Sequence, residues 1–213
     1  MIYSYESGAL NESFSDIWGE TIDLLNNYQD EGENLSIRTG SNNSVRWKCG
    51  EDVEGGIIRD MWDPTLYGNP GKMTDADYYC DTGDNGGVHY NSGIPNHAYA
   101  LIVDGGTYNG QTINGLGLTK AAHIFWRTLS EYLTRTSGFS TFADAIEAST
   151  NDLIGINLEG LSTTETPAGI SGNVITSADY NEVLKALIAV ELRSENNCTF
   201  ATILIENDDL CEC

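Results

Sequence analysis

The stretch from Glu6 to Asn26 constrains the fold more than any other part of the chain. Its apolar side chains, together with one threonine, recur at steps of three and four: Leu10, Phe14, Ile17, Trp18, Thr21 and Leu25. This spacing is the period of a helix that has one apolar face, and such a face must be buried against other elements. We therefore expect a long helix here, packed along one side against the rest of the domain.

An acidic stripe runs along the same predicted helix. Glu12, Asp16 and Asp23 are spaced i, i+4 and i+11, which places them within about 40° of one another at 100° per residue. Two acids four residues apart repel by a few tenths of a kcal/mol. A bound cation or a cationic side chain would offset this repulsion, because carboxylate oxygens are ligands for zinc and calcium. The spacing alone favours a solvated acidic face over a metal site.

Helical periodicity returns in the second half of the chain. Ser92 is the expected N-cap of the first of these helices, and Gly105 or Gly106 its expected stop. The four patterns cover about residues 92–105, 118–133, 141–154 and 177–192. Together with the first helix they predict a mainly α, five-helix bundle-like domain with long irregular loops.

The remaining segments define the expected organisation of the chain. Residues 27–56 are polar and predict a variable surface loop, and residues 57–90 predict irregular structure with turns. We expect one helical domain over residues 1–192 and an acidic, cysteine-containing tail over residues 193–213. A short strand is expected at 199–206 within that tail.

The charge balance excludes several classes of partner. The chain has 32 acidic and 10 basic residues and a formal net charge of −22, which argues against binding to nucleic acid or to an anionic membrane. No run approaches the roughly 18 apolar residues of a membrane span. Residues 1–16 lack the basic-then-apolar profile of a signal peptide.

Five cysteines are spaced too irregularly for a zinc ribbon or a redox motif. They occupy positions 49, 80, 198, 211 and 213. One or two disulfides with one free thiol is the favoured interpretation, and it is typical of a secreted protein. The C-x-C pair formed by Cys211 and Cys213 leaves two alternatives open, soft-metal binding or disulfide formation.

The stretch "GDNGGVHYNSG" places His89 just after a glycine pair and before a predicted helix. Asp84 is close enough in sequence to orient the imidazole ring, which is the arrangement that a catalytic histidine needs. A purely structural histidine is the commoner outcome for such a pattern. His97 and His123 lie within helical patterns, and we expect both to be structural.

Taken together, three stretches resemble the thermolysin-like (M4) family of secreted zinc metalloendopeptidases in order and wording. They are "ESGALNESFSDIWG", "DNGGVHYNSGIPNHAYAL" and "GLTKAAHIFWRTLSEYLTRTSGFSTFADAI". The resemblance covers about residues 2–192, with a divergent segment at 27–45. It implies the fold of that family's C-terminal helical domain, a secreted location, and a peptide or protein substrate.

The resemblance also implies a zinc site. Glu12 would be the carboxylate ligand of the catalytic zinc, and Asp16 would hold one of the zinc-binding histidines. The family's H-E-x-x-H helix, which supplies two histidine ligands and the general base, is absent from the sequence. That helix precedes the carboxylate ligand in the family, so it would lie upstream of Met1. We therefore predict that this chain alone neither holds zinc tightly nor cleaves peptides.

Further roles follow from the resemblance. His89 would donate a hydrogen bond to the oxyanion of the tetrahedral intermediate, with Asp84 orienting it and Tyr3 as a second donor. Arg59, in "GGIIRDMW", would hold the substrate backbone.

Calcium positions are only partly retained. Asp23 and Glu51 match acidic calcium-ligand positions, whereas Arg46 and Lys48 stand where calcium-binding members carry acids. A basic side chain would replace the cation by pairing with Asp23 or Glu51. At most one calcium ion is expected.

Three functions follow. The first is the C-terminal portion of a secreted zinc metalloendopeptidase, completed by an upstream catalytic-helix segment in cis. The second is a non-catalytic peptide- or partner-binding domain derived from such a peptidase. The third is one half of a split enzyme that receives the H-E-x-x-H segment in trans.

Overall fold

The first helix forms as its periodicity predicts. The computed structural model describes residues 1–27 and 33–198, and in it α1 spans Tyr5–Asn26. Leu10, Phe14 and Ile17 are buried along its inner face. The helix ends where Asn27 adopts the left-handed conformation with φ 50° and donates its backbone N–H to the carbonyl of Asp23.

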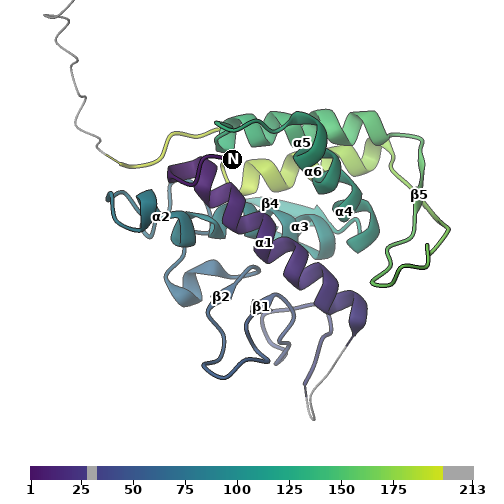
Figure 1. Cartoon of the computed structure of the whole chain (residues 1–213), viewed down its shortest axis with the longest axis horizontal. Helices are drawn as coiled ribbons and strands as arrows, with labels where there is room; N and C mark the ends of the chain where they lie inside the picture. Colours follow the sequence, from purple (N-terminus) through teal and green to yellow (C-terminus); the bar gives the residue numbers. More distant parts are fainter. Residues whose placement is uncertain (28–32, 199–213) are drawn as a thin grey trace, which may run out of the picture.

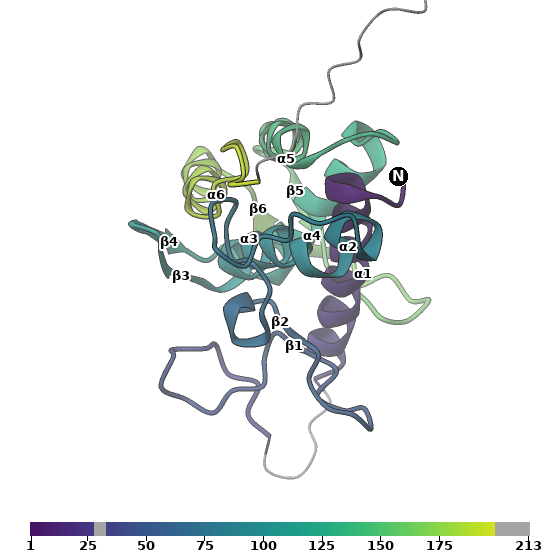
Figure 2. The ribbon, with the colours of Figure 1, turned by 90° about the vertical axis from the view of Figure 1, so that its left-hand side faces the viewer.

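Four further long helices follow, and the first of them, α3, lies at the centre. Along the chain α3 (Gly93–Asp104) is followed by α4 (Leu118–Arg127), α5 (Phe139–Leu153) and α6 (Ser177–Ala189). Every residue of α3 from Gly93 to Val103 is buried, as expected for a mostly apolar helix at the centre of a core. In the ribbon α1 crosses one side of the molecule while α5 and α6 form the layer at the top (Figures 1 and 2). The prediction of a mainly α, helical domain is confirmed.

An aromatic cluster joins four helices at the centre of the core. The rings of Phe14, Tyr99, Phe125 and Phe142 come from α1, α3, α4 and α5, in that order. Tyr99 and Phe125 meet edge to face with centroids 4.7 Å apart, and Phe14 and Phe142 do so at 5.8 Å. Such pairs contribute about 0.5–1.5 kcal/mol each beyond the burial of their area.

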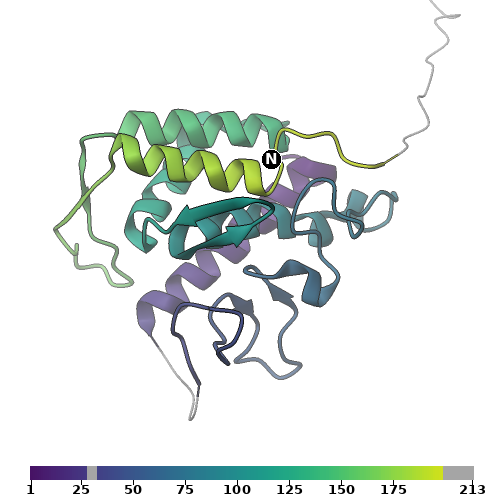
Figure 3. The ribbon, with the colours of Figure 1, turned by 180° about the vertical axis from the view of Figure 1, so that it is seen from behind.

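Short strands occur only as pairs within the described residues. The three antiparallel pairs are β1 (Lys48–Cys49) with β2 (Arg59–Asp60), β3 (Gly105–Tyr108) with β4 (Gln111–Asn114), and β5 (Asn157–Glu159) with β6 (Ile170–Val174). From behind, the β3–β4 hairpin is seen beside α6 (Figure 3). None of these strands was expected from the sequence, because two to five residues are too few to show a period of two.

Several local predictions need correction. The segment 57–90 contains a 3-10 helix, Pro64–Tyr67, and the short helix α2, Asp84–Asn91. Ser92 lies at the predicted N-cap position of α3, but its side chain forms no capping bond, because its hydroxyl donates instead to the carbonyl of His89 at 3.3 Å. The helix expected to run to residue 133 changes after Arg127 to a π-helical turn, Thr128–Tyr132.

One disulfide and one free thiol are present among the described residues. Cys80 is bonded to Cys198, and Cys49 is free and buried. This agrees with the predicted combination, while Cys211, Cys213 and the strand expected at 199–206 lie outside the described residues. No helix in the described part of the chain combines the length and apolar character needed to cross a membrane.

Candidate active site

Three side chains predicted to be functional meet beside the N-terminal half of α1. The Tyr3 hydroxyl donates to Oε1 of Glu12 at 2.5 Å and lies 3.2 Å from Nε2 of His89. The same Nε2 is 3.3 Å from Oε2 of Glu12. A carboxylate, a phenol and an imidazole thus converge on one point, although 86 residues separate Tyr3 from His89.

Asp84 fixes the imidazole ring. Its Oδ1 lies 2.6 Å from Nδ1 of His89, and its Oδ2 accepts the backbone N–H of His89 at 2.8 Å. Because Nδ1–H points at a carboxylate, Nε2 is the ring nitrogen that faces Glu12 and Tyr3. Nε2 donates a hydrogen bond when the ring carries both protons. Asp84 and His89 therefore stand in the relation that the sequence predicted.

A left-handed turn makes this arrangement. Asp84, Asn85, Gly86 and Gly87 have φ values of 49°, 52°, 87° and 79°, a run that is unfavourable for residues with a side chain. A Cβ at Gly86 would lie 2.4 Å from the Tyr5 ring. The turn therefore needs glycine for both conformational and steric reasons, and it carries Asp84 back toward the imidazole.

Replacing Gly86 by Ala should destabilise the chain by about 3 kcal/mol, because a strained φ and a close contact act together. Gly110→Ala is the matched control: its φ is 78°, but nothing lies within 4 Å of the added Cβ. That variant should lose only about 1 kcal/mol. Urea unfolding of both variants measures the difference, and equal losses would contradict the close contact with Tyr5.

Asp16 and Arg59 bind each other. Nε and Nη2 of Arg59 donate to the two carboxylate oxygens of Asp16 at 2.8 and 2.7 Å, and Nδ2 of Asn96 adds a bond to Oδ2 at 2.8 Å. Burial alone would lower the pKa of Arg59, but the bonds and charge of Asp16 raise it overall. The guanidinium thus offsets the repulsion between Glu12 and Asp16. Asn96, buried on α3, was not singled out from the sequence.

Glu20 continues the acidic stripe into the interior. It is only 7 % exposed, and its pKa is raised to about 8 by burial first and by the charge of Glu51 second, while a hydrogen bond with Cys49 acts in the opposite direction. Burial likewise raises the pKa of the Cys49 thiol. Glu20 was missed in the sequence, although its position four residues after Asp16 was the available signal.

The calcium positions, Asp23 and Glu51, lie in an acidic environment. Burial is the first cause that raises the pKa of each, and the charges of Asp52 and Glu33 raise both further. Among the described residues no group of three or more His, Cys, Asp and Glu side chains is arranged to hold a metal ion. Calcium binding therefore stays a prediction.

The expected pairing of Arg46 with these acids is wrong. Arg46 donates from Nε and Nη2 to both oxygens of Asp104 at 2.5 and 2.7 Å, and Trp47 Nε1 donates to the same carboxylate at 2.7 Å. Within residues 1–27 and 33–198, Lys48 also forms no ion pair with Asp23 or Glu51. The bidentate contact with Asp104 occupies the Arg46 donors that a pairing with Asp23 or Glu51 would need.

A cleft of about 440 Å³ opens beside the converging side chains. Its lining comprises Ile58, Arg59, Tyr67, Asn69, Asp84, His89 and Tyr90. Asn69 supports the site directly, since its Nδ2 donates to the carbonyl of His89 at 3.4 Å. Tyr67 and Asn69 were not identified from the sequence, because neither belongs to a quoted motif. Tyr90 directly follows His89 in "DNGGVHYNSGIPNHAYAL" but was given no role.

The residues present fit only part of a zinc site. Catalytic zinc is usually held by three protein ligands, and Glu12 supplies one carboxylate. The three histidines of the sequence are His89, His97 and His123, and none belongs to an H-E-x-x-H motif. His89 is held by Asp84, and His97 and His123 bond backbone carbonyls. The described chain therefore offers one suitable carboxylate and hydrogen-bond donors, without a complete zinc site.

Comparison with known proteins identifies the family of the chain. The family model described as "Thermolysin metallopeptidase, alpha-helical domain" matches residues 1–166. A zinc metalloproteinase of Renibacterium salmoninarum is 35 % identical over 199 residues, which is 91 % of this chain and 32 % of that protein. A thermolysin of Alicyclobacillus acidocaldarius subsp. acidocaldarius is 38 % identical over 160 residues, which is 73 % of this chain and 26 % of that protein.

A solved structure leads to the same family. The precursor of protealysin, a metalloproteinase from Serratia proteamaculans, superposes with a TM-score of 0.57 at 25 % identity, over 90 % of this chain and 52 % of that one. The chain spans at most about a third of the length of the curated relatives it matches. It belongs to the thermolysin metallopeptidase family and corresponds to its α-helical domain.

Proposed function

We propose that this chain is the part of a zinc metalloendopeptidase that supplies the carboxylate zinc ligand, Glu12, and the hydrogen-bond donors to the oxyanion, His89 and Tyr3. The observation that carries the proposal is the convergence of these three side chains within 3.3 Å of one another. Zinc, when bound, would activate the attacking water and polarise the peptide carbonyl.

The chain's own residues would stabilise the negative charge that forms on the carbonyl oxygen. Donors already fixed in position contribute most to such stabilisation. The hydrogen bond to Glu12 is the largest of the causes that raise the pKa of Tyr3 to about 12, so the phenol keeps its proton at neutral pH and is able to donate. Asp84 anchors His89 through both the ring and the backbone, which holds Nε2 toward the same place.

Arg59 would bind the substrate backbone. Two of its N–H groups are occupied by Asp16, and a guanidinium has five. Because Arg59 also lines the cleft, the remaining donors are available to a peptide carbonyl there. Asp16 would then keep the guanidinium in place as well as contacting a zinc-binding histidine.

The missing ligands would come from an H-E-x-x-H segment outside these 213 residues, supplied in cis or in trans. The chain alone would be inactive. Peptides or proteins would be the substrates and the location extracellular, proposals supported by the family to which the chain belongs.

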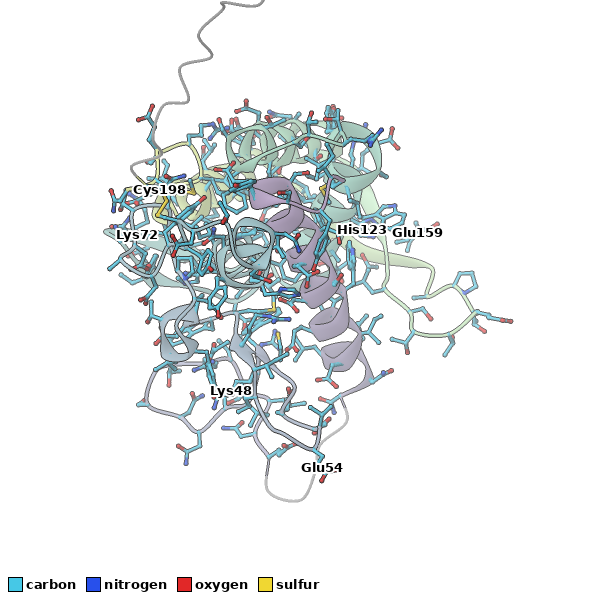
Figure 4. All side chains as sticks on the ribbon, turned by 60° about the vertical axis from the view of Figure 1, so that its left-hand side comes forward. Lys48, Glu54, Lys72, His123, Glu159 and Cys198 are labelled. Carbon is cyan, nitrogen blue, oxygen red and sulfur yellow. A yellow bond between two sulfur atoms is a disulfide. The ribbon has the colours of Figure 1, made fainter. Side chains whose placement is uncertain are left out.

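A peptide-hydrolysis assay tests the proposed role of His89 as a donor to the oxyanion. With an H-E-x-x-H segment joined ahead of residue 1, His89→Gln should lower kcat for peptide hydrolysis by about 10²–10³, the usual effect of removing one oxyanion donor, without changing zinc content. His123→Gln is the matched control, because His123 donates to the carbonyl of Glu159 (Figure 4). An unchanged kcat in His89→Gln would rule out the role.

A non-catalytic binding domain is the second candidate. Ile2 and Tyr5 are 43 % and 46 % exposed, which would suit a partner. In the same assay such a domain would bind the peptide in the cleft without hydrolysing it when the H-E-x-x-H segment is supplied.

A further inference from the structure

A second pocket, of about 190 Å³, shares no lining residue with the catalytic cleft. Its walls come from residues 62–65, Gly71, α3 and β3. Two buried or half-buried polar side chains, His97 and Tyr108, face it, and neither takes part in the site described above. The pocket therefore needs its own explanation.

His97 presents a lone pair to this pocket. It is 3 % exposed, and its Nδ1 lies 3.0 Å from the carbonyl of Gly71, so Nδ1 is the ring nitrogen that donates. Burial is the main cause that lowers its pKa to about 4, so the ring is neutral at physiological pH. Nε2 is then a hydrogen-bond acceptor, and it has no partner among residues 1–27 and 33–198.

Tyr108 adds an aromatic face and a hydroxyl. Its ring meets that of His97 edge to face, with centroids 4.3 Å apart. A Cβ at residue 71 would lie 2.7 Å from the Tyr108 hydroxyl, so glycine there leaves the room that the ring occupies. The pKa of Tyr108 is raised to about 12, first by burial and then by the charges of Asp75, Glu191 and Asp63. Its hydroxyl forms no hydrogen bond within the described part of the chain.

The charge around the pocket is negative. Asp63 lines it, and among the described residues only Oδ1 of that carboxylate is engaged, by the Thr65 hydroxyl at 2.8 Å. The lining that the structure describes contains no lysine or arginine.

Two cations that adjoin lining residues, Arg38 beside Trp62 and Lys72 next to Gly71, are already paired. Arg38 stacks over the Trp62 ring at 4.8 Å, and its charge is paired with Asp60 at 2.5 Å. Lys72, labelled in Figure 4, is paired with Glu191 at 2.9 Å. The pocket therefore combines acceptors, a carboxylate and aromatic faces without a compensating positive charge.

We propose that this pocket binds a primary ammonium group carried on a short aliphatic chain. An ammonium has three N–H donors, and the pocket offers three acceptors: Nε2 of His97, the Tyr108 oxygen and the free oxygen of Asp63. Charge-assisted bonds and cation–π attraction favour it over an alcohol of the same shape. The aliphatic stem would lie against Leu101 and Pro64. This inference does not depend on zinc or on peptide hydrolysis.

Titration of the full 213-residue chain with n-butylammonium tests the proposal. Binding is monitored by the NMR chemical shifts of the Gly71 and Gly106 backbone amides. We expect saturable shifts at both, and at least about tenfold weaker binding of 1-butanol, which lacks the charge. Asp63→Asn should weaken butylammonium binding about fivefold. Asp77→Asn is the matched control, because Asp77 is exposed and outside the pocket. Tyr108→Phe is a second variant that removes only the hydroxyl.

Three results would overturn the proposal: no shift at Gly71 and Gly106, equal binding of 1-butanol, or equal weakening by Asp63→Asn and Asp77→Asn. A blocked Gly-Lys-Gly peptide identifies the source of the ammonium group. Shifts produced by the peptide at the same amides would make the ligand a lysine side chain. Shifts produced by butylammonium alone would make it a free amine, and both results support the pocket.

Discussion

Replacing Glu20 by Gln is expected to raise the free energy of unfolding at pH 7 by about 3 kcal/mol. The folded chain raises the pKa of this carboxyl from 4.5 to about 8, mainly through burial. Each pKa unit corresponds to about 1.4 kcal/mol, and the span from 4.5 to pH 7 gives the figure as an order of magnitude. Gln keeps the shape and the hydrogen-bonding ability of the protonated acid, without a proton to lose.

The pH dependence has a definite sign. Between the unfolded pKa of 4.5 and the folded pKa of about 8, the folded state holds a proton on Glu20 that the unfolded state has released. The contribution of Glu20 to stability is therefore fully present below pH 4.5 and is lost progressively as the pH rises through about 8. Glu20→Gln should be nearly neutral in effect at pH 4.5 and most stabilising above pH 8.

Urea unfolding at pH 5, 7 and 8.5 measures this difference. Glu54→Gln is the control, because Glu54 is exposed in the loop between β1 and β2 (Figure 4). It carries the same change of charge and should leave stability within about 0.5 kcal/mol at every pH. A wild-type protein and a Glu20→Gln variant with parallel pH profiles would show that the buried carboxyl does not titrate as described.

Loss of the Cys80–Cys198 disulfide should lower the free energy of unfolding by about 4–5 kcal/mol. The bond closes a sequence separation of 118 residues, and the loss of chain entropy in the unfolded state grows with loop length. In the native state, Asn197 also donates to the carbonyl of Thr74 at 2.8 Å beside this bond. The double substitution Cys80→Ser with Cys198→Ser removes the constraint.

Reduction supplies the internal control. With Cys211 and Cys213 replaced by Ser in both proteins, dithiothreitol should lower the stability of the chain that keeps Cys80 and Cys198 to that of the double variant and should leave the double variant unchanged. Because Cys49 is buried and free, its thiol is the same in both proteins. If the oxidised and reduced forms of the chain that keeps Cys80 and Cys198 unfold at the same urea concentration, the disulfide contributes little to stability.

Long periodic segments were predictable from the sequence, and short elements were not. The apolar repeat of α1 and the patterns that became α3 to α6 identified five helices, because burial of one face imposes the period on many residues. The β3–β4 hairpin and α2 were not predicted from the sequence, because each contains too few residues to show a periodic pattern. Four successive left-handed residues at Asp84–Gly87 have no periodicity at all, and tertiary contacts with Tyr5 hold them.

Candidate site residues could be named from the sequence where a resemblance carried them, and their roles stay predictions. Glu12 and His89 belong to quoted stretches far apart in the sequence, and the fold brings both together with Tyr3. The pairing of Arg59 with Asp16 was not predictable, because it depends on how the β1–β2 segment packs on α1. Buried polar groups such as Glu20 and Asn96 were not identified from the sequence for a related reason: the burial of a polar side chain is determined by the whole fold.

The zinc affinity of a Glu12→Gln variant is the decisive test of the proposal that Glu12 is a zinc ligand. The measurement is equilibrium dialysis of zinc on the chain completed by an H-E-x-x-H segment, with Glu54→Gln as the matched control. Changes to groups that merely support a zinc ligand reduce affinity about 10–100-fold, so loss of the ligand itself should reduce it by at least about 100-fold. A Glu12→Gln variant that binds zinc as tightly as Glu54→Gln would contradict the assignment of Glu12 as the metal ligand.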